Sequence, residues 1–138
     1  MKYFIANISA HIVIFIGIII LLIIFTNKNR ERKMKFAPMY FLPILFAALA
    51  VLDMLFIVGP RLLDLSDVLH SNYKISVGVI EDKSFFNNMI TIDGTTYFVN
   101  PLHDIPEIGT EVRYKYTDNS DFSPNIIEAD ESADGFYQ

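Results

Sequence analysis

Two long apolar runs, separated by a short basic segment, constrain this chain more than any other feature. The runs cover residues 3–25 and 36–58. A helix needs about 20 apolar residues to cross the ~30 Å hydrocarbon core of a bilayer, and both runs reach that length. The sequence therefore predicts a transmembrane helical hairpin over residues 1–60, with helices at about 4–25 and 36–58.

The segment between the runs, residues 26–35, sets the expected orientation. Its five basic residues are opposed only by Glu31. Because short loops rich in Lys and Arg stay in the cytoplasm, we expect a multi-pass protein of the plasma (inner) membrane with both termini extracytoplasmic. The first run is longer than a signal-peptide core, and no small-residue cleavage site follows Phe25. We therefore expect an uncleaved anchor.

Each run carries one side chain that is costly to place in lipid: His11 in the first and Asp53 in the second. They lie at nearly equal distances from Glu31 at the centre of the loop, so the two helices should bring them to similar depth. Since ionisable groups in a membrane usually find partners, we expect an intramembrane His11–Asp53 pair; the alternative is that each is hydrated near the outer interface. The same count places Gly17 opposite Ala47 and its neighbour, where small residues would permit close helix approach.

Residues 61–72 predict a short amphipathic juxtamembrane helix. Leu62, Leu65 and Leu69 recur at helical spacing, with Asp64 and Asp67 on the other side. The acidic polar face favours packing beneath a soluble domain over lying on the membrane surface. Gly59-Pro60 is expected to end the second spanning helix before this one begins.

From residue 73 the hydrophobic period changes to two, which is typical of strands. The Asp93-Gly94 pair predicts a tight hairpin turn. Residues 73–129 should contain five short strands, which the alternation places at about 73–80, 89–92, 95–100, 110–117 and 125–129. Such strands with one apolar face predict a small OB-like or SH3-like β-barrel. The expected fold is thus a two-helix transmembrane hairpin followed by a five-stranded barrel, with an acidic flexible tail at 130–138.

The charge distribution excludes some partners. Fourteen of the sixteen acidic residues, but only five of the eleven basic ones, follow residue 60. An acidic domain does not attract nucleic acid, which requires a basic surface. Cysteine is absent, and neither a metal-binding His motif nor a nucleophile motif occurs. We therefore expect no enzymatic activity, no catalytic, metal-binding or cofactor-binding residues, and no small-molecule substrate.

Two loops offer candidate partner-binding residues. Phe85 and Phe86 are adjacent in the segment 81–88, and two neighbouring aromatic residues cannot both point into a core. At least one should contact lipid, the amphipathic helix or a partner protein. His103 and Asp104 lie in the segment 101–109, which is rich in turn residues.

Three stretches resemble small bacterial two-helix membrane proteins with a tethered OB-like domain: SVGVI at residues 76–80, IDGTTY at 92–97 and IGTEVRYKY at 108–116. The similarity is to the domain-of-unknown-function family 3592 and, more distantly, to the NfeD-type proteins, and it covers about the last half of the chain. The resemblance implies a scaffold or binding role.

These observations favour a membrane-anchored module that presents an acidic β-domain to another protein of the cell envelope. Two alternatives stay open. The chain could be an immunity protein against a secreted toxin or bacteriocin, because an acidic outer domain suits a cationic attacker. It could also be an accessory subunit of a membrane enzyme or transporter, with His11 and Asp53 facing a partner helix.

Overall fold

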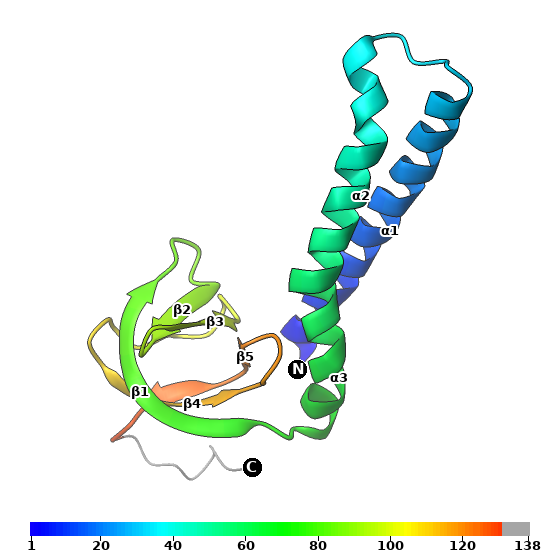
Figure 1. Ribbon diagram of the computed structural model, residues 1–138. Helices are drawn as coiled ribbons and strands as arrows, with labels where there is room; N and C mark the ends of the chain where they lie inside the picture. The colour runs from blue at the N-terminus through cyan, green and yellow to red at the C-terminus, as the bar shows by residue number, and fades with distance from the viewer. Residues whose placement is uncertain (131–138) are drawn as a thin grey trace. The chain divides into compact units, whose positions relative to one another are not determined.

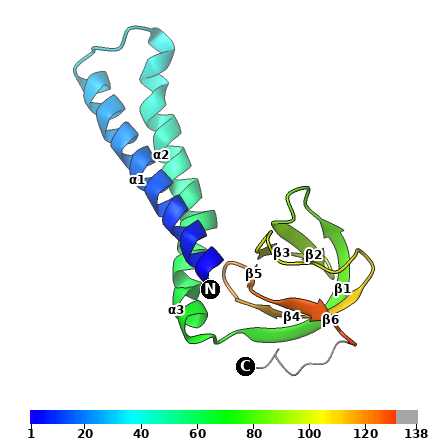
Figure 2. The ribbon, with the colours of Figure 1, turned by 180° about the vertical axis from the view of Figure 1, so that it is seen from behind.

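The computed structural model describes residues 1–130, so the predicted tail lies outside the described residues except for Asp130. The chain divides into two compact units. A helical unit comprises Ile5–Leu62, and a β unit combines Met1–Phe4 with the chain from Leu63 onward (Figures 1 and 2). The helical segments are α1 (Lys2–Arg30), a 3₁₀ turn (Ala37–Phe41), α2 (Leu42–Asp53), a π-helical turn (Met54–Val58) and α3 (Gly59–His70).

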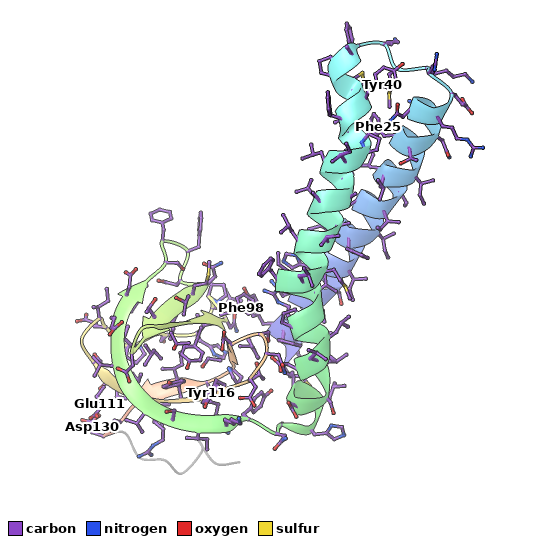
Figure 3. The ribbon with its side chains drawn as sticks, viewed as in Figure 1. Phe25, Tyr40, Phe98, Glu111, Tyr116 and Asp130 are labelled. Atoms are coloured by element: carbon purple, nitrogen blue, oxygen red, sulfur yellow. The ribbon has the colours of Figure 1, made fainter. Side chains whose placement is uncertain are left out.

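The two helical stretches Lys2–Arg30 and Ala37–His70 are long and apolar enough to cross a membrane. Only 6% and 17% of their most apolar segments are buried within the protein. The core helix of a soluble domain would hide this surface instead. The predicted hairpin of two long apolar helices is therefore present, and its apolar side chains face outward. At its loop end, Phe25 and Tyr40 lie between the two helices (Figure 3).

Gly59-Pro60 does not end the second helix, contrary to the sequence-based expectation. The helical path continues from the π-helical turn directly into α3, with Pro60 in its first turn. The wide turn accommodates the proline, because the Gly59 N–H donates to Met54 O five residues back. A Cβ at Gly59 would lie 2.5 Å from Met54 O, so glycine fits this turn.

The expected close approach at Gly17 is wrong. A Cβ added to Gly17 would meet nothing within 4 Å. Larger side chains, including Phe15 and Ile19, face Ala47 and Ala50 across an apolar space of about 400 Å³. Gly17 is therefore not a point of close contact between the helices.

The β unit contains six strands rather than five. They are β1 (Lys74–Lys83), β2 (Met89–Ile92), β3 (Thr95–Val99), β4 (Glu111–Tyr116), β5 (Phe122–Ser123) and β6 (Ile126–Glu128). The additional strand, β5, lies where the sequence predicts only a turn. Two residues are too short a stretch to show an alternating pattern.

The sheet curls into a nearly closed barrel with the order β5-β3-β2-β1-β4-β6. The long strand β1 makes this possible, because its first part pairs with β4 and its second part with β2. An irregularity between Ile80 and Asp82 lies where the partner changes. Such bulges bend and twist a strand. The barrel therefore closes around β1.

The core of the β unit is built from side chains that alternate inward along these strands. Tyr97 and Tyr114 are almost fully buried, and their hydroxyl groups lie 3.3 Å apart. Burial, with the hydrogen bond to Tyr114, raises the pKa of Tyr97. Tyr116 packs against the same cluster (Figure 3). The remaining core members are Ile80, Ile90, Ile92, Val99 and Val112.

The first residues of the chain complete a second apolar layer on this unit. Phe4 is fully buried, with its ring 4.9 Å from that of Phe122. The ring of Tyr3 stacks on that of Phe98 at 5.4 Å. The start of α1 is therefore part of the β unit, which the hydropathy pattern did not indicate.

The buried face of α3 agrees only in part with the predicted one, because Val68 of the apolar stripe is buried but the polar Asp64 is buried beside it. Asp64 and Val68 are completely buried, whereas Leu62 and Leu69 are exposed. The reason is that the Asp64 carboxylate accepts hydrogen bonds from the turn between β4 and β5. This network, described below, holds Asp64 inside and turns the leucines outward.

Candidate functional site

The structure places His11 and Asp53 together within the helical unit. His11 Nδ1 lies 3.6 Å from Asp53 Oδ1, an ion-pair distance when the imidazole is protonated. Asp53 is 9% exposed. Three buried atoms lack a hydrogen-bond partner among the described residues here: Asn7 Oδ1, His11 Nδ1 and Asp53 Oδ2. The pair therefore joins the two helices without satisfying all of its polar atoms.

Asp64 forms a second buried carboxylate site, and its hydrogen bonds are abundant. Asn119 donates its side-chain N–H to Asp64 Oδ1 at 2.6 Å and its backbone N–H to both carboxylate oxygens at 3.2 Å. Ser120 donates its backbone N–H at 2.6 Å and its hydroxyl at 2.7 Å to Oδ2. The network clamps α3 to the turn between β4 and β5.

Two neighbouring carboxyl groups at the clamp, those of Asp64 and Asp121, have pKa values shifted in opposite directions. Burial alone would raise the pKa of Asp64, but hydrogen bonds from Ser120, Asn119 and Thr117 outweigh it and hold that pKa below its usual value. Burial raises the pKa of Asp121, as do the negative charges of Asp64 and Asp118. Asp64 is therefore held as an anion that structures the turn.

Phe85 and Phe86 lie at the tip of the turn between β1 and β2, and both are exposed, at 93% and 74%. Their rings meet edge to face, with centroids 5.1 Å apart. Ser84 Oγ accepts backbone N–H groups from Asn88 at 3.2 Å and Met89 at 3.0 Å. The turn is thus closed by its own hydrogen bonds, while both rings point away from the core.

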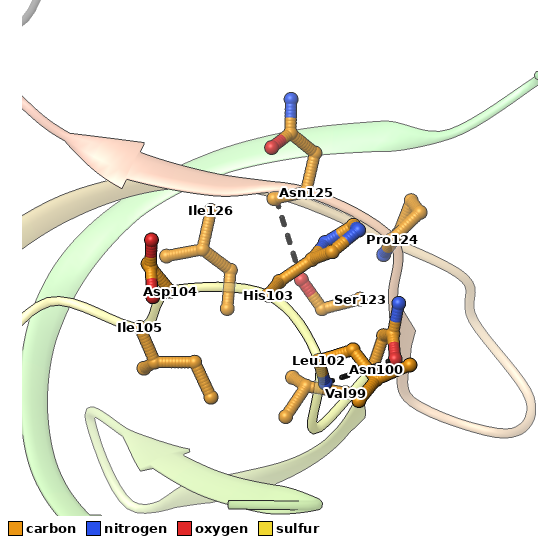
Figure 4. A pocket seen from close by; sticks show the side chains of 10 residues that line it. All are labelled: Val99, Asn100, Leu102, His103, Asp104, Ile105, Ser123, Pro124, Asn125 and Ile126. Atoms are coloured by element: carbon orange, nitrogen blue, oxygen red, sulfur yellow. Dashed lines mark hydrogen bonds between the residues drawn. The ribbon is translucent and has the colours of Figure 1, made fainter. Parts of the chain in front are cut away.

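His103 and Asp104 border a hollow at the seam of the barrel (Figure 4). The hollow measures about 310 Å³ and lies between the loop after β3 and the link from β5 to β6. Ile105 and Ile126 supply apolar side chains to it, and both pack against the core. Asn100 Oδ1 accepts the Leu102 N–H at 3.1 Å and so orders the loop.

A second hollow of about 590 Å³ continues along β6 and shares Asp104, Ile105 and Ile126 with the first. Its border carries the carboxylates of Asp104, Glu128 and Asp130. Together the two hollows form the seam groove, lined by residues 99–106 and 123–130. The groove combines apolar side chains from Ile105 and Ile126 with an acidic border.

The seam groove also contains a strand edge that no other strand within residues 1–130 pairs with. β6 is the last strand in the sheet order. Lys115 N donates to Asn125 O, which sets the alternation of the antiparallel β4–β6 ladder. The backbone groups of Ile126 and Glu128 therefore point away from β4, toward the groove. Such an edge can accept an added strand.

The structure brings together only some of the candidate residues. His11 and Asp53 form one site, and Phe85–Phe86 and His103–Asp104 lie on two separate loops of the β unit. Sequence reasoning placed Asn7 at the wet outer end of the first helix and Asp64 on a polar face, but it missed their place in these two sites and the edge of β6. Asn7 precedes His11 by one helical turn and could have been found from that spacing.

Within residues 1–130, no group of three or more His, Cys, Asp or Glu side chains is arranged to hold a metal ion. Comparison with protein-family models, with curated proteins and with solved structures found no match to this chain.

Proposed function

We propose that this chain is a non-enzymatic, membrane-anchored binding module whose seam groove docks another protein of the cell envelope. Two helices long and apolar enough to span a bilayer support the anchoring. The basic residues between them favour a cytoplasmic loop, which leaves both termini and the β unit on the outer face.

The strand pairing supports an OB-like identity for the β unit. β5 and β6 are separated only by Pro124 and Asn125, so they can be regarded as one interrupted fifth strand. That strand pairs in parallel with β3 and antiparallel with β4. This is the pairing that closes an OB barrel. It is consistent with the resemblance to tethered OB-like membrane proteins.

The seam groove is the observation that carries the binding proposal. It offers apolar contacts from Ile105 and Ile126, an edge of β6 that no described strand pairs with, and an acidic border. Extended segments bind such edges through their main chain, with side chains giving specificity. The negative charge of Asp104, Glu128 and Asp130 favours a segment that carries basic residues.

Site-specific photo-crosslinking in intact cells tests this proposal. A photoreactive residue in place of Asp104 should yield a discrete adduct, whereas one in place of Asp82, an equally exposed aspartate on β1, should not. Asp104→Lys should weaken docking, with Asp82→Lys as its matched control. Equal adducts from both positions would contradict docking at the groove.

The captured protein would also separate the alternatives. A secreted toxin would favour an immunity role, and a transporter or membrane enzyme would favour an accessory subunit. Orientation is tested separately by a reporter that is active only outside the cytoplasm. It should be active when fused after Gln138 and inactive when inserted at Arg32, and the reverse pattern would overturn the outer location.

A further inference from the structure

The turn between β1 and β2 differs from the rest of the β unit in its surface. It extends beyond the body of the barrel (Figure 1). Phe85 is 93% exposed and Phe86 is 74% exposed. Met89, where β2 begins, is 44% exposed. Three large apolar side chains are thus presented to solvent at one projecting tip, outside the seam groove.

The tip is also free of charge. Residues 84–92 contain no acidic, basic or histidine side chain, although the chain after residue 60 is strongly acidic. A charged side chain would oppose entry into an apolar medium. The absence of any over nine consecutive residues removes that obstacle at this tip.

The backbone of the tip is largely satisfied from within. Ser84 N donates to Met89 O at 2.9 Å, and Asn87 N donates to Ser84 O at 2.9 Å. Ser84 Oγ accepts two further backbone N–H groups. A peptide segment can approach hydrocarbon only when its polar backbone groups are paired. This turn meets that condition for most of its groups.

A bilayer is close to this unit if the helices span one. Phe4 belongs to the β unit, and Ile5 begins the helical unit. Leu62 and Leu63 make the second junction, in the middle of α3. Because neither junction contains a linker, the β unit remains near the bilayer surface at a high effective concentration.

We propose that Phe85 and Phe86 insert into the interfacial region of the bilayer and form a third membrane attachment besides the two helices. The proposal rests on the membrane anchoring argued above. Aromatic side chains are favoured at this level of a membrane. The acidic charge of the surrounding unit selects a surface of zwitterionic phospholipid over an anionic one.

Tryptophan fluorescence tests the insertion, because the chain contains no tryptophan of its own. The full chain carrying Phe85→Trp or Phe86→Trp is reconstituted in phosphatidylcholine vesicles, with and without lipid brominated near the head group. We expect blue-shifted emission that the brominated lipid quenches. Both positions are exposed, so neither substitution disturbs the core.

Two matched substitutions serve as controls. Phe56→Trp replaces a residue on the π-helical turn that is 72% exposed, and it should be quenched if the helices span the bilayer. Leu102→Trp replaces an apolar residue of another loop, 87% exposed, and it should stay unquenched. Quenching at positions 85 and 56 but not at 102 supports the proposal.

The outcomes separate two failures. If Phe56→Trp is quenched while both tip variants remain unquenched, the insertion is refuted, and the tip is left to contact a protein. If Phe56→Trp itself is unquenched, the membrane anchoring fails first. Equal quenching at 102 and 85 would refute a specific insertion of the tip.

Discussion

Within residues 1–130 two aspartates are buried, one in each unit, and they have opposite surroundings. Asp64 in the β unit receives hydrogen bonds from Asn119 and Ser120 on both carboxylate oxygens. Asp53 in the helical unit lies 3.6 Å from His11 and leaves Oδ2 without a partner among the described residues. Burial of a charge stabilises a fold only where donors replace its lost water. Asp64 therefore holds its unit together, whereas Asp53 is tolerated at a cost.

The largest effect should follow removal of the Asp64 carboxylate. Asp64→Ala removes the acceptor of the half-buried Ser120 N–H and hydroxyl and of the exposed Asn119 N–H groups. Water can replace the acceptor only at Asn119, so we expect the free energy of unfolding of the β unit to fall by about 1–3 kcal/mol. Chemical denaturation of the full chain in detergent, followed by tyrosine absorbance, measures this. The isosteric Asp64→Asn should lose less, and an unchanged midpoint for Asp64→Ala would contradict the clamp.

Replacing one glycine in each unit should show that the β unit is packed more tightly than the helical unit. A Cβ at Gly78 would lie 2.6 Å from Ile92 Cγ2 and would also meet the Asp93 carboxylate. Gly78→Ala should therefore destabilise the β unit by about 1–3 kcal/mol through overpacking.

Gly17→Ala is the matched control, because its Cβ would meet nothing within 4 Å. It should be neutral or stabilise α1 by up to about 1 kcal/mol. Thermal unfolding by circular dichroism distinguishes the two variants. Equal destabilisation by both would mean that Gly17 lies in a tight helix contact after all.

The incomplete pairing of Asp53 predicts a result opposite to that for Asp64. Replacing both partners together, His11→Leu with Asp53→Leu, removes a buried pair whose polar atoms are incompletely satisfied, so the hairpin should unfold no more easily and gain up to about 1 kcal/mol. Unfolding of the full chain in mixed micelles of increasing denaturing detergent provides the measurement. Marked destabilisation would show that the His11–Asp53 pair contributes more than its geometry indicates.

The smallest effect is expected from a change in pH. The stability of the β unit should change in opposite directions in mildly and in more strongly acidic solution. Asp121 has a raised pKa when folded, so its unfavourable contribution at neutral pH disappears as pH falls through that pKa. Asp64 has a lowered pKa when folded, so its contribution is complete above the unfolded value and is lost as pH falls further.

Stability of the β unit should therefore rise slightly in mildly acidic solution and then decline. Melting temperatures over a pH series test this profile. Asp121→Asn should abolish the rise, and Asp64→Asn should flatten the decline. A monotonic profile that neither substitution changes would contradict the assignment of these two groups.

The sequence predicted those features that repeat over many residues. The two apolar runs indicated the helical pair, and alternation located β1 to β4. Counting from Glu31 placed His11 and Asp53 at one depth, and the structure puts their side-chain atoms 3.6 Å apart. Long, regular patterns determine such features, so local sequence carries enough information.

The rest depends on contacts between distant segments. β5 has only two residues, and it pairs with β3 while Phe122 packs on Phe4. The spacing of leucines in α3 indicated a buried leucine face, but the donors of Asn119 and Ser120 select Asp64 instead. The seam groove forms only where the loop after β3, the link from β5 to β6 and the end of β6 come together. No window of the sequence contains these partners at once.

The contact of Phe4 with Phe122 has a consequence for the order of folding. It closes a chain loop that encloses both long helices, and contacts between residues so far apart form slowly. The last apolar layer of the barrel therefore depends on residues that lie at opposite ends of the described chain. Under the membrane anchoring proposed above, insertion of the helices would be an assembly step for the domain that follows them, and a failed insertion would leave Phe122 uncovered.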